Sequence, residues 1–190
     1  MYRPTPALPV VIVLAAGRGE RFAASGGTVH KLQALLAGKR VLDHLLDAVK
    51  ASGLAYHVVM PDGGQPISQS GMGDSIAAGV NATLSAGAWL ILPADLPLIR
   101  SSTLRAIAFA PPCAVVVPVY KGQRGHPVRF GLECAQDLLN LQGNKGAAEV
   151  IRAQAAIESI AFIELDDIGC VFDVDTLDDL QRAESWLAGL

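Results

Sequence analysis

The sequence has few cysteines, few charged residues and no long hydrophobic run. Its 3 cysteines fit neither a disulfide framework nor a zinc knuckle, so we expect buried free thiols at Cys113, Cys134 and Cys170. Charged residues make up only 17% of the chain and never form a long basic stretch, which argues against nucleic acid as a partner. The longest apolar run, 9–16, is much shorter than the roughly 20 residues that a membrane span needs, so we expect no membrane partner.

The rest of the composition is that of a folded protein. Hydrophobic residues make up 51% of the 190 residues, and the formal net charge is -3. A chain with this many apolar residues and so small a net charge is not expected to be intrinsically disordered. No linker or repeat divides the chain, so we predict a single domain over 1–190. The segment 1–6 has two prolines and lacks the pattern of a secretory signal, which favours a cytoplasmic location.

Strand-like and helix-like segments alternate along the chain. Apolar runs predict strands at 9–14, 56–60, 89–92, 114–120, 126–130, 159–165 and 170–172. Helical spacing predicts helices at 41–52, 74–84, 103–109, 133–139, 146–154 and from 176 onward, with Gly53 as a C-cap and Thr176 and Asp179 as a capping box. Apolar strands separated by helices indicate an α/β fold with three layers, Rossmann-like, in which helices cover both faces of a mostly parallel sheet. Ligands of such sheets bind beyond the carboxyl ends of the strands.

A loop rich in small residues follows the first predicted strand. It reads Leu14-Ala15-Ala16-Gly17-Arg18-Gly19-Glu20-Arg21-Phe22. Small residues let a polyphosphate approach the backbone amides, and the cations Arg18, Arg21 and Lys31 can offset its charge. The loop has no Walker A pattern, and it lacks the third glycine of the dinucleotide-binding fingerprint. That fingerprint also needs an acidic residue about 20 positions further on, and Asp62 is too far away in the sequence. Both points disfavour an NAD-linked oxidoreductase. An ordinary turn with solvated basic side chains is the alternative.

Carboxylates stand at two places that suit a metal ion. Asp95 comes directly after the buried strand 89–92, where one carboxylate together with substrate phosphates can hold Mg²⁺. Asp173 and Asp175 alternate along an extended segment, so their side chains should point to the same side, and one of them can supply a second oxygen. The alternative for Asp95 is a role in a turn or as a helix cap. The alternative for Asp173 and Asp175 is that one of them caps the last helix, and Asp175 is the better placed of the two.

Two further segments are candidates for ligand contact. The turn Gly71-Met72-Gly73-Asp74-Ser75 opens a predicted helix and allows the backbone to contact a base or ribose, although a flexible loop with a capping residue explains it equally well. The segment 122–128 combines glycines, polar side chains and a proline, as ligand-recognition loops and simple turns both do. Taken alone, His126 is more typical of a structural residue.

In this order, the segments resemble the nucleotidyltransferase family that includes the molybdenum cofactor cytidylyl- and guanylyltransferases. The loop 14–22 with Lys31 is similar to the family's LAAGxSxRMG…K motif, and 71–75 is similar to its GMGxS turn. The segments 93–97, 125–128 and 173–176 resemble its PADxP, GHPV and DIDTPEDL motifs. The resemblance covers nearly the whole chain.

The resemblance implies Mg²⁺-dependent transfer of a nucleoside monophosphate from a nucleoside triphosphate to a phosphorylated acceptor, with release of pyrophosphate. The implied acceptor is molybdopterin or the molybdenum cofactor, and a client molybdoenzyme is a further partner that it suggests. Ala16, where the guanylyl branch has glycine, favours CTP over GTP and thus CMP as the transferred group.

The resemblance also assigns roles to residues. It implies catalytic roles for Arg18, Arg21, Lys31 and Asp95 and metal ligation by Asp95, Asp173 and Asp175. The implied nucleotide-binding residues are Leu14, Ala15, Ala16, Gly17, Arg18, Gly19, Lys31, Gly71, Met72, Gly73, Ser75 and Asp95. The implied acceptor-binding residues are Gly125, His126 and Pro127.

The chain departs from the family pattern at several positions. Gly19 replaces a serine, 23–30 lengthens the interval to Lys31, and Leu177 replaces a proline. Asn144 and Ala148 stand where the family often has an acid and a base. Two alternatives therefore stay open: a transferase of the same fold for another phosphorylated acceptor, and a non-catalytic module that carries a nucleotide or cofactor.

Overall fold

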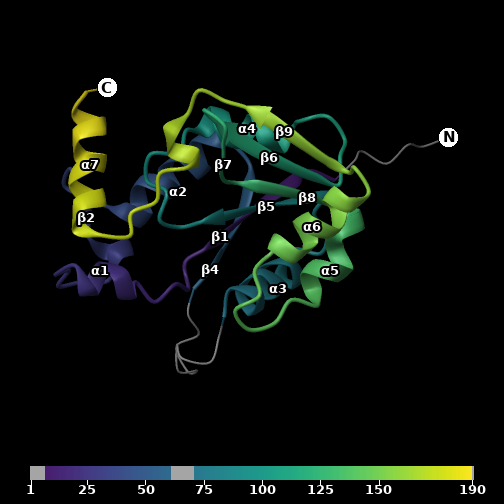
Figure 1. Cartoon of the computed structure of the whole chain (residues 1–190), viewed down its shortest axis with the longest axis horizontal. Coiled ribbons are helices and arrows are strands. Elements are labelled where there is room, and N and C mark those ends of the chain that lie inside the picture. The colour runs from purple at the N-terminus through teal and green to yellow at the C-terminus, as the bar shows by residue number, and fades with distance from the viewer. Residues whose placement is uncertain (1–6, 61–70, 190) are drawn as a thin grey trace.

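The computed structural model describes residues 7–60 and 71–189, and a seven-stranded sheet forms its centre (Figure 1). The strands are β1 (Pro9–Leu14), β4 (Ala55–Val59), β5 (Ala88–Pro93), β6 (Val115–Tyr120), β7 (Gln123–Arg124), β8 (Val128–Gly131) and β9 (Ile160–Glu164). The order is β4-β1-β5-β8-β6-β7, with β9 paired to β6. Pairs β1/β4, β1/β5 and β6/β9 are parallel, whereas β8 is antiparallel to β5 and β6, and β7 to β6. The sheet is therefore mixed but mostly parallel, as the sequence predicts.

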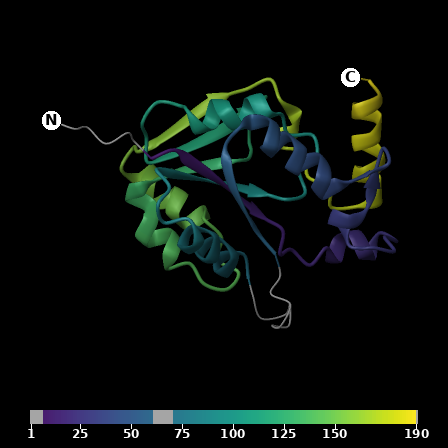
Figure 2. The same cartoon turned by 180° about the vertical axis from the view of Figure 1, so that it is seen from behind.

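Helices cover both faces of this sheet (Figures 1 and 2). One face carries α2 (Val41–Ser52) and α4 (Ser101–Ala108), and the other carries α3 (Met72–Ala82), α5 (Ala135–Leu139) and α6 (Ala148–Ala156). Beyond one end of the sheet lie α1 (Glu20–Ala24), α7 (Leu177–Ala188) and the small hairpin of β2 (Leu35–Leu36) and β3 (Lys39–Arg40). In the described part of the chain, every helix is too short or too polar to cross a lipid bilayer.

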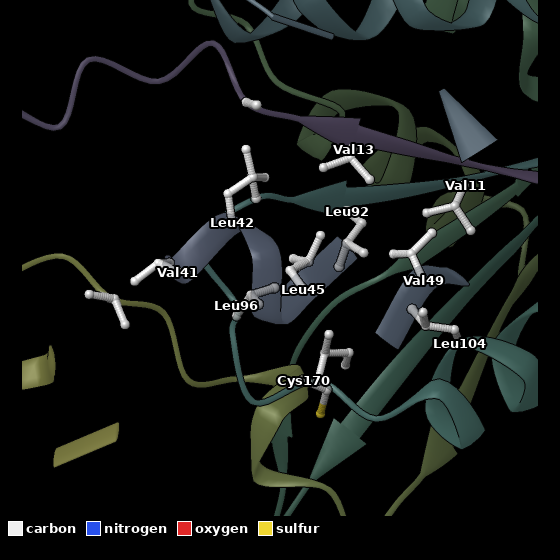
Figure 3. Packing of buried hydrophobic residues seen from close by; sticks show 14 of the residues in the cluster. Val11, Val13, Val41, Leu42, Leu45, Val49, Leu92, Leu96, Leu104 and Cys170 are labelled. Carbon is white, nitrogen blue, oxygen red and sulfur yellow. The ribbon is translucent and has the colours of Figure 1, made fainter. Parts of the chain in front are cut away.

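The side-chain alternation of the strands builds two hydrophobic cores. Val11 and Val13 of β1 belong to the core that α2 and α4 cover, where they pack with Leu45 and Val49 (Figure 3). Ile12, between those two valines, belongs to the opposite core with residues of α3. Every one of these side chains has no exposed surface, so the central strands are fixed from both sides.

Local signals in the sequence give several element boundaries correctly. The structure confirms the helix at 41–52 and its C-cap at Gly53, whose φ of 72° lies in the left-handed region that glycine tolerates. It also confirms the capping box, in which Thr176 and Asp179 accept hydrogen bonds from each other's backbone N–H. Asp175 is therefore not the cap of α7.

Other predictions need correction. The segment 170–172 is not a strand, because the chain forms the 3₁₀ helix η3 (Ile168–Cys170), at whose start Asp167 accepts a hydrogen bond from the Gly169 N–H. The segment 172–176 has no strand pairing, and the strand predicted from 126 begins only at Val128. The predicted loop through 27 contains α1, and Cys113 is half-buried rather than buried. Segment 1–6 and Asp62 lie outside the described residues.

The parallel strands bring distant loops to one edge. Leu14, at the end of β1, is in register with Val59 of β4 and Pro93 of β5. The loop after β1 and the segment with Asp95 therefore leave the sheet side by side, and the Ala94 N–H donates to the Leu14 carbonyl at 3.1 Å. This edge is where the candidate site forms.

Candidate functional site

A cavity of about 690 Å³ lies at the carboxyl ends of the strands. It is lined by most of the residues that the sequence singles out, among them Leu14, Ala16, Gly17, Arg18, Gly19, Arg21, Lys31, Gly71, Met72, Ser75, Asp95, Gly125, His126, Asp173 and Asp175. Three predicted residues do not line it: Ala15 packs into the core, Gly73 is pressed against the backbone of Lys145, and Pro127 is buried. The volume is within the range of small-molecule sites.

Lys31 is the centre of the charged part of this cavity. It begins the 3₁₀ helix η1 (Lys31–Gln33), and its residue is only 8% exposed. Its Nζ donates to Asp95 Oδ2 at 2.6 Å and to Asp175 Oδ1 at 2.7 Å. The second oxygen of Asp175 forms an ion pair with the largely exposed Arg21. Two carboxylates thus share one buried ammonium group, and the arginine can reach out into the cavity.

The charges of this cluster stabilise one another. Burial lowers the pKa of Lys31, but the hydrogen bonds and charges of Asp95 and Asp175 outweigh this, so the pKa is raised overall. Burial raises the pKa of Asp175, but the hydrogen bond and charge of Lys31 and the charge of Arg21 bring it below its ordinary value. The pKa of Asp173 is raised, mainly by desolvation and then by the carboxylates of Asp175 and Asp95. Lys31 and Asp175 are therefore charged at neutral pH.

Asp95 keeps one oxygen free for a further ligand. The backbone joins it to the segment 173–175, because the Val174 N–H donates to the Asp95 carbonyl at 2.9 Å. Whereas Oδ2 binds Lys31, Oδ1 is buried and has no hydrogen-bond partner among the described residues. A buried carboxylate oxygen without a partner is costly unless an ion, water or ligand binds it. Asp95 is thus a site where a cation would be stabilised.

Local contacts fix the conformation of the loop after β1. The Gly17 carbonyl forms a hydrogen bond of 2.8 Å with His30 Nε2, which ties the loop to the residue before Lys31. Gly19 has a φ of 64°, a conformation that favours glycine, and α1 begins at the next residue. Arg18 lies 3.4 Å from Glu20 on the exposed side of the loop. The arrangement leaves Gly17, Arg18 and Gly19 facing the cavity.

On the opposite wall, the turn at 71–75 is hydrogen-bonded to the loop around Gly143, which is far away in the sequence. Asp74 accepts hydrogen bonds from the Gly71 N–H at 2.8 Å and from the Gly143 N–H at 3.1 Å. These two backbone hydrogen bonds lower the pKa of Asp74. A Cβ atom on Gly71 would lie 2.0 Å from the Gly143 carbonyl, and one on Gly73 would lie 2.4 Å from the Lys145 carbonyl. Both glycines are therefore needed for this close approach.

The segment with His126 forms a third part of the wall. The His126 N–H donates to the Cys170 carbonyl at 2.7 Å, and a Cβ on Gly125 would lie 2.3 Å from that oxygen. The His126–Pro127 peptide bond is cis. Burial lowers the pKa of His126, while the charge of Asp95 and a hydrogen bond with the Ile91 backbone partly oppose this shift. The imidazole of His126 is therefore neutral at neutral pH, and its Nδ1 is buried without a partner in the part of the chain described.

Some residues of the wall were not predicted. Gln123 and Arg124 of β7 line the cavity, and the Arg124 guanidinium lies 4.7 Å from the centre of the Phe162 ring. Their presence in the polar segment 122–128 was the only signal in the sequence. Asn144 also lines the cavity, whereas Ala148 is exposed and does not.

Solved structures with the same architecture are known. A nucleotidyl transferase from Methanothermobacter superposes with a TM-score of 0.77 at 20% identity, over 95% of this chain and 98% of that one. The manganese complex of Rv0371c from Mycobacterium tuberculosis gives a TM-score of 0.72 at 20% identity, over 95% and 100%. Molybdopterin-guanine dinucleotide biosynthesis protein A from Archaeoglobus fulgidus gives 0.63 at 16% identity, over 95% and 100%. At these identities the likeness shows the fold alone, which is that of the α/β nucleotidyltransferases.

The sequence comparisons narrow this class to a family. Residues 11–158 match the model of the MobA-like NTP transferase domain, so the chain belongs to that family. The bifunctional protein GlmU of Xanthomonas campestris pv. campestris is 31% identical over 118 residues, which are 53% of this chain and 25% of that protein. The chain thus matches about a quarter of the length of this curated relative.

Proposed function

We propose that this protein is a Mg²⁺-dependent nucleotidyltransferase that transfers CMP from CTP to a molybdopterin-type phosphorylated acceptor and releases pyrophosphate. The observation that carries the proposal is the cluster of Lys31, Asp95 and Asp175 on the wall of the 690 Å³ cavity, beside the loop 16–19. A buried cation, carboxylates and exposed backbone at the end of parallel strands meet the needs of a triphosphate with its metal ion. We propose that 1–190 acts as one domain; the cytoplasmic location stays a prediction.

The residues fit a magnesium ion. Asp95 Oδ1 is a buried oxygen without a partner, and Asp95 lies near enough to Asp173 for its charge to raise the pKa of Asp173. No three His, Cys, Asp or Glu side chains converge on a common metal position within 7–60 and 71–189. Mg²⁺ commonly takes one or two carboxylates and completes its shell with phosphates and water, so the carboxylates of Asp95 and Asp173 would be sufficient. Asp95 and Asp173 would hold the ion, and Asp175 stays with Lys31 and Arg21.

The bound ion would neutralise phosphate charge, and the chain's own groups do the rest. The acceptor phosphate is already anionic near neutral pH, so its attack on the α-phosphorus needs no general base. As the bond between the α- and β-phosphates breaks, Lys31 and Arg21 can stabilise the charge that appears on pyrophosphate. The loop 16–19 fixes the triphosphate for in-line attack, because its backbone and Arg18 face the cavity.

The two remaining walls of the cavity would select the base of the nucleotide and the acceptor. The turn with Gly71, Met72 and Ser75 faces the cavity and would contact the base and ribose, with Ala16 favouring CTP. Gly125 and His126 would face the acceptor, while Pro127 would act through the shape of the backbone. A client molybdoenzyme would receive the product.

A second acceptor class has one specific observation in its favour. Asn144 lines the cavity as a neutral amide where the family often has an acid. A different charge at this wall favours another phosphorylated acceptor, such as a sugar phosphate or an alcohol phosphate. The carrier alternative predicts nucleotide binding without pyrophosphate release.

The test is pyrophosphate release from CTP, GTP and ATP with Mg²⁺, with molybdopterin and with a panel of phosphorylated sugars and alcohols. We expect release from CTP that depends on molybdopterin and is lost in Asp95→Ala. The matched control is Asp47→Ala, because Asp47, on α2, forms an exposed ion pair with Lys39 of β3 and does not line the 690 Å³ cavity. Nucleotide binding without release for every acceptor would contradict the transferase.

A further inference from the structure

A second cavity of about 420 Å³ lies next to the first one. It is bounded by the turn between β6 and β7, by η3 with the residues after it, and by the first half of α7. No motif in the sequence assigns a ligand to this cavity, and the proposed triphosphate site lies in the first one. Its volume is within the range of small-molecule sites and is sufficient for a ring system.

The two cavities share part of their wall. Gln123, Val171 and Asp173 line both of them. Asp173 is also the residue proposed to hold the metal ion together with Asp95. A ligand in the second cavity would therefore lie beside Asp173, next to the proposed place of reaction of the acceptor phosphate.

The lining of the second cavity combines apolar surface with two cations, Lys121 and Arg182, and two carboxylates, Asp173 and Asp179. Ile168, Val171 and Phe172 provide an apolar wall. Arg182 lies over the Phe172 ring at 5.3 Å from its centre, and Lys121 lies over the Tyr120 ring at 5.1 Å. Guanidinium groups stack against aromatic rings and also bind anions, so this lining suits a ring that carries a negative charge.

The two cations have different partners. Lys121 forms no ion pair among the residues of the described chain, so its ammonium group is available to an anion. Arg182 forms one at 3.3 Å with Asp179, whose other oxygen already accepts from Thr176. One carboxylate that is shared in this way does not fully satisfy the five N–H donors of a guanidinium. An anionic substituent would therefore find two cations at the rim of this cavity.

We infer that the 420 Å³ cavity binds the non-reacting part of the acceptor, a ring system with a second anionic group that Lys121 and Arg182 hold. This inference rests on the proposed function, which it deepens by specifying the acceptor. The acceptor then has two anionic ends, one of which is the phosphate that reacts beside Asp173. Acceptors that lack the second anionic group bind less tightly.

The test compares two pterin probes by equilibrium binding in the absence of nucleotide. Pterin-6-carboxylate carries an anionic substituent, and 6-methylpterin has a neutral one on the same ring. We expect the carboxylate to bind more tightly than the methyl compound, with about a tenfold loss of its affinity in Lys121→Met or Arg182→Met. The affinity of 6-methylpterin should change much less in both variants.

The matched control is Arg105→Met. Arg105 also lies over an aromatic ring, at 5.4 Å from the centre of Phe109, but it lines neither cavity. Unchanged carboxylate affinity in both cavity variants, equal affinity for the two probes, or no binding of either probe would each overturn the inference. Thermal unfolding of each variant shows whether the fold is retained.

The same variants separate this inference from the proposed function. If the protein releases pyrophosphate with an acceptor whose KM does not change in Lys121→Met and Arg182→Met, the transferase stands and the second site is wrong. If the variants lose carboxylate affinity but no acceptor supports pyrophosphate release, the site stands and the transferase is wrong.

Discussion

Two sides of the main cavity are built in different ways. On one side, Lys31, Asp95 and Asp175 meet through side-chain charges, with distances of 2.6 and 2.7 Å. On the other side, Gly71 and Gly143 meet through backbone groups, and Asp74 bonds to the N–H of both. The first side consists of groups that a polyphosphate or a cation can rearrange. The second side is fixed by close backbone packing, because a single added carbon atom would collide with it.

The difference indicates a division of labour between the two sides. A site that must bind and release charged phosphates needs ion pairs that can exchange partners. A site that must distinguish one base from another needs a wall of constant shape. Changes on the charged side should therefore affect the reaction, and changes on the glycine side should affect folding and nucleotide affinity together.

The largest effect is expected for the charged side. Asp95→Asn keeps the size of the side chain but removes the charge that Lys31 and a metal ion need. We expect pyrophosphate release to fall at least about a hundredfold. The melting temperature should decrease without loss of the fold, because Lys31 loses the charge of Asp95 but keeps that of Asp175. Steady-state kinetics and thermal unfolding together check this. A variant that keeps more than half of the wild-type rate would contradict the assignment.

The glycine side should respond through stability. In Gly71→Ala the new Cβ would lie 2.0 Å from the Gly143 carbonyl, so the two loops must separate. We expect a loss of about 1–3 kcal/mol in the free energy of unfolding and weaker nucleotide binding. Gly17→Ala is the control for stability, since nothing lies within 4 Å of its Cβ position. Equal free energies of unfolding for Gly71→Ala and Gly17→Ala would contradict the prediction that close backbone packing fixes the glycine side.

A smaller effect is expected on the pH dependence of the free energy of unfolding, through His126 in the third part of the cavity wall. Burial holds the pKa of His126 below its ordinary value of 6.5, so the unfolded chain takes up a proton more readily than the folded one. The free energy of unfolding should therefore be fully retained above pH 6.5 and decrease as the pH falls from there toward the folded pKa. His126→Gln should flatten this part of the profile, measured by urea unfolding. An identical slope in the variant would show that another group titrates.

The smallest effect is expected for the thiols. Burial raises the pKa of Cys134 and Cys170 to about 11, whereas Cys113 is half-buried. Iodoacetamide at about pH 8 should therefore alkylate Cys113 first, because only thiolates react. Peptide mass spectrometry identifies the modified residue. Equally fast labelling of Cys170 would mean that its wall of the cavity opens in solution.

Much of the fold was predictable because its signals are local. The helix α2 shows apolar residues at helical spacing and ends at a glycine, and the capping box of α7 lies within four residues. The parallel sheet follows from apolar strands that alternate with helices. Because such strands end at one edge, the sequence also predicts correctly that the loop after β1 and Asp95 lie together.

The pairings within the site were not predictable, because their partners are far apart in the sequence. Asp74 and Gly143 are separated by 69 positions, and Lys31 and Asp175 by 144. The segment 170–172 was misread as a strand because a short apolar run does not distinguish a buried turn from a strand. In the structure, Asp167 bonds to the Gly169 N–H, which favours the 3₁₀ turn.

Asp95 has the central role in the proposed function, as the residue through which a divalent cation strengthens nucleotide binding. Calorimetric titration of CTP into the wild-type protein and into Asp95→Asn, each with and without Mg²⁺, measures this directly. We predict that Mg²⁺ increases the affinity of the wild-type protein for CTP about tenfold or more and leaves that of the variant nearly unchanged. An equal increase in both proteins would contradict the account, because the cation would then bind without Asp95.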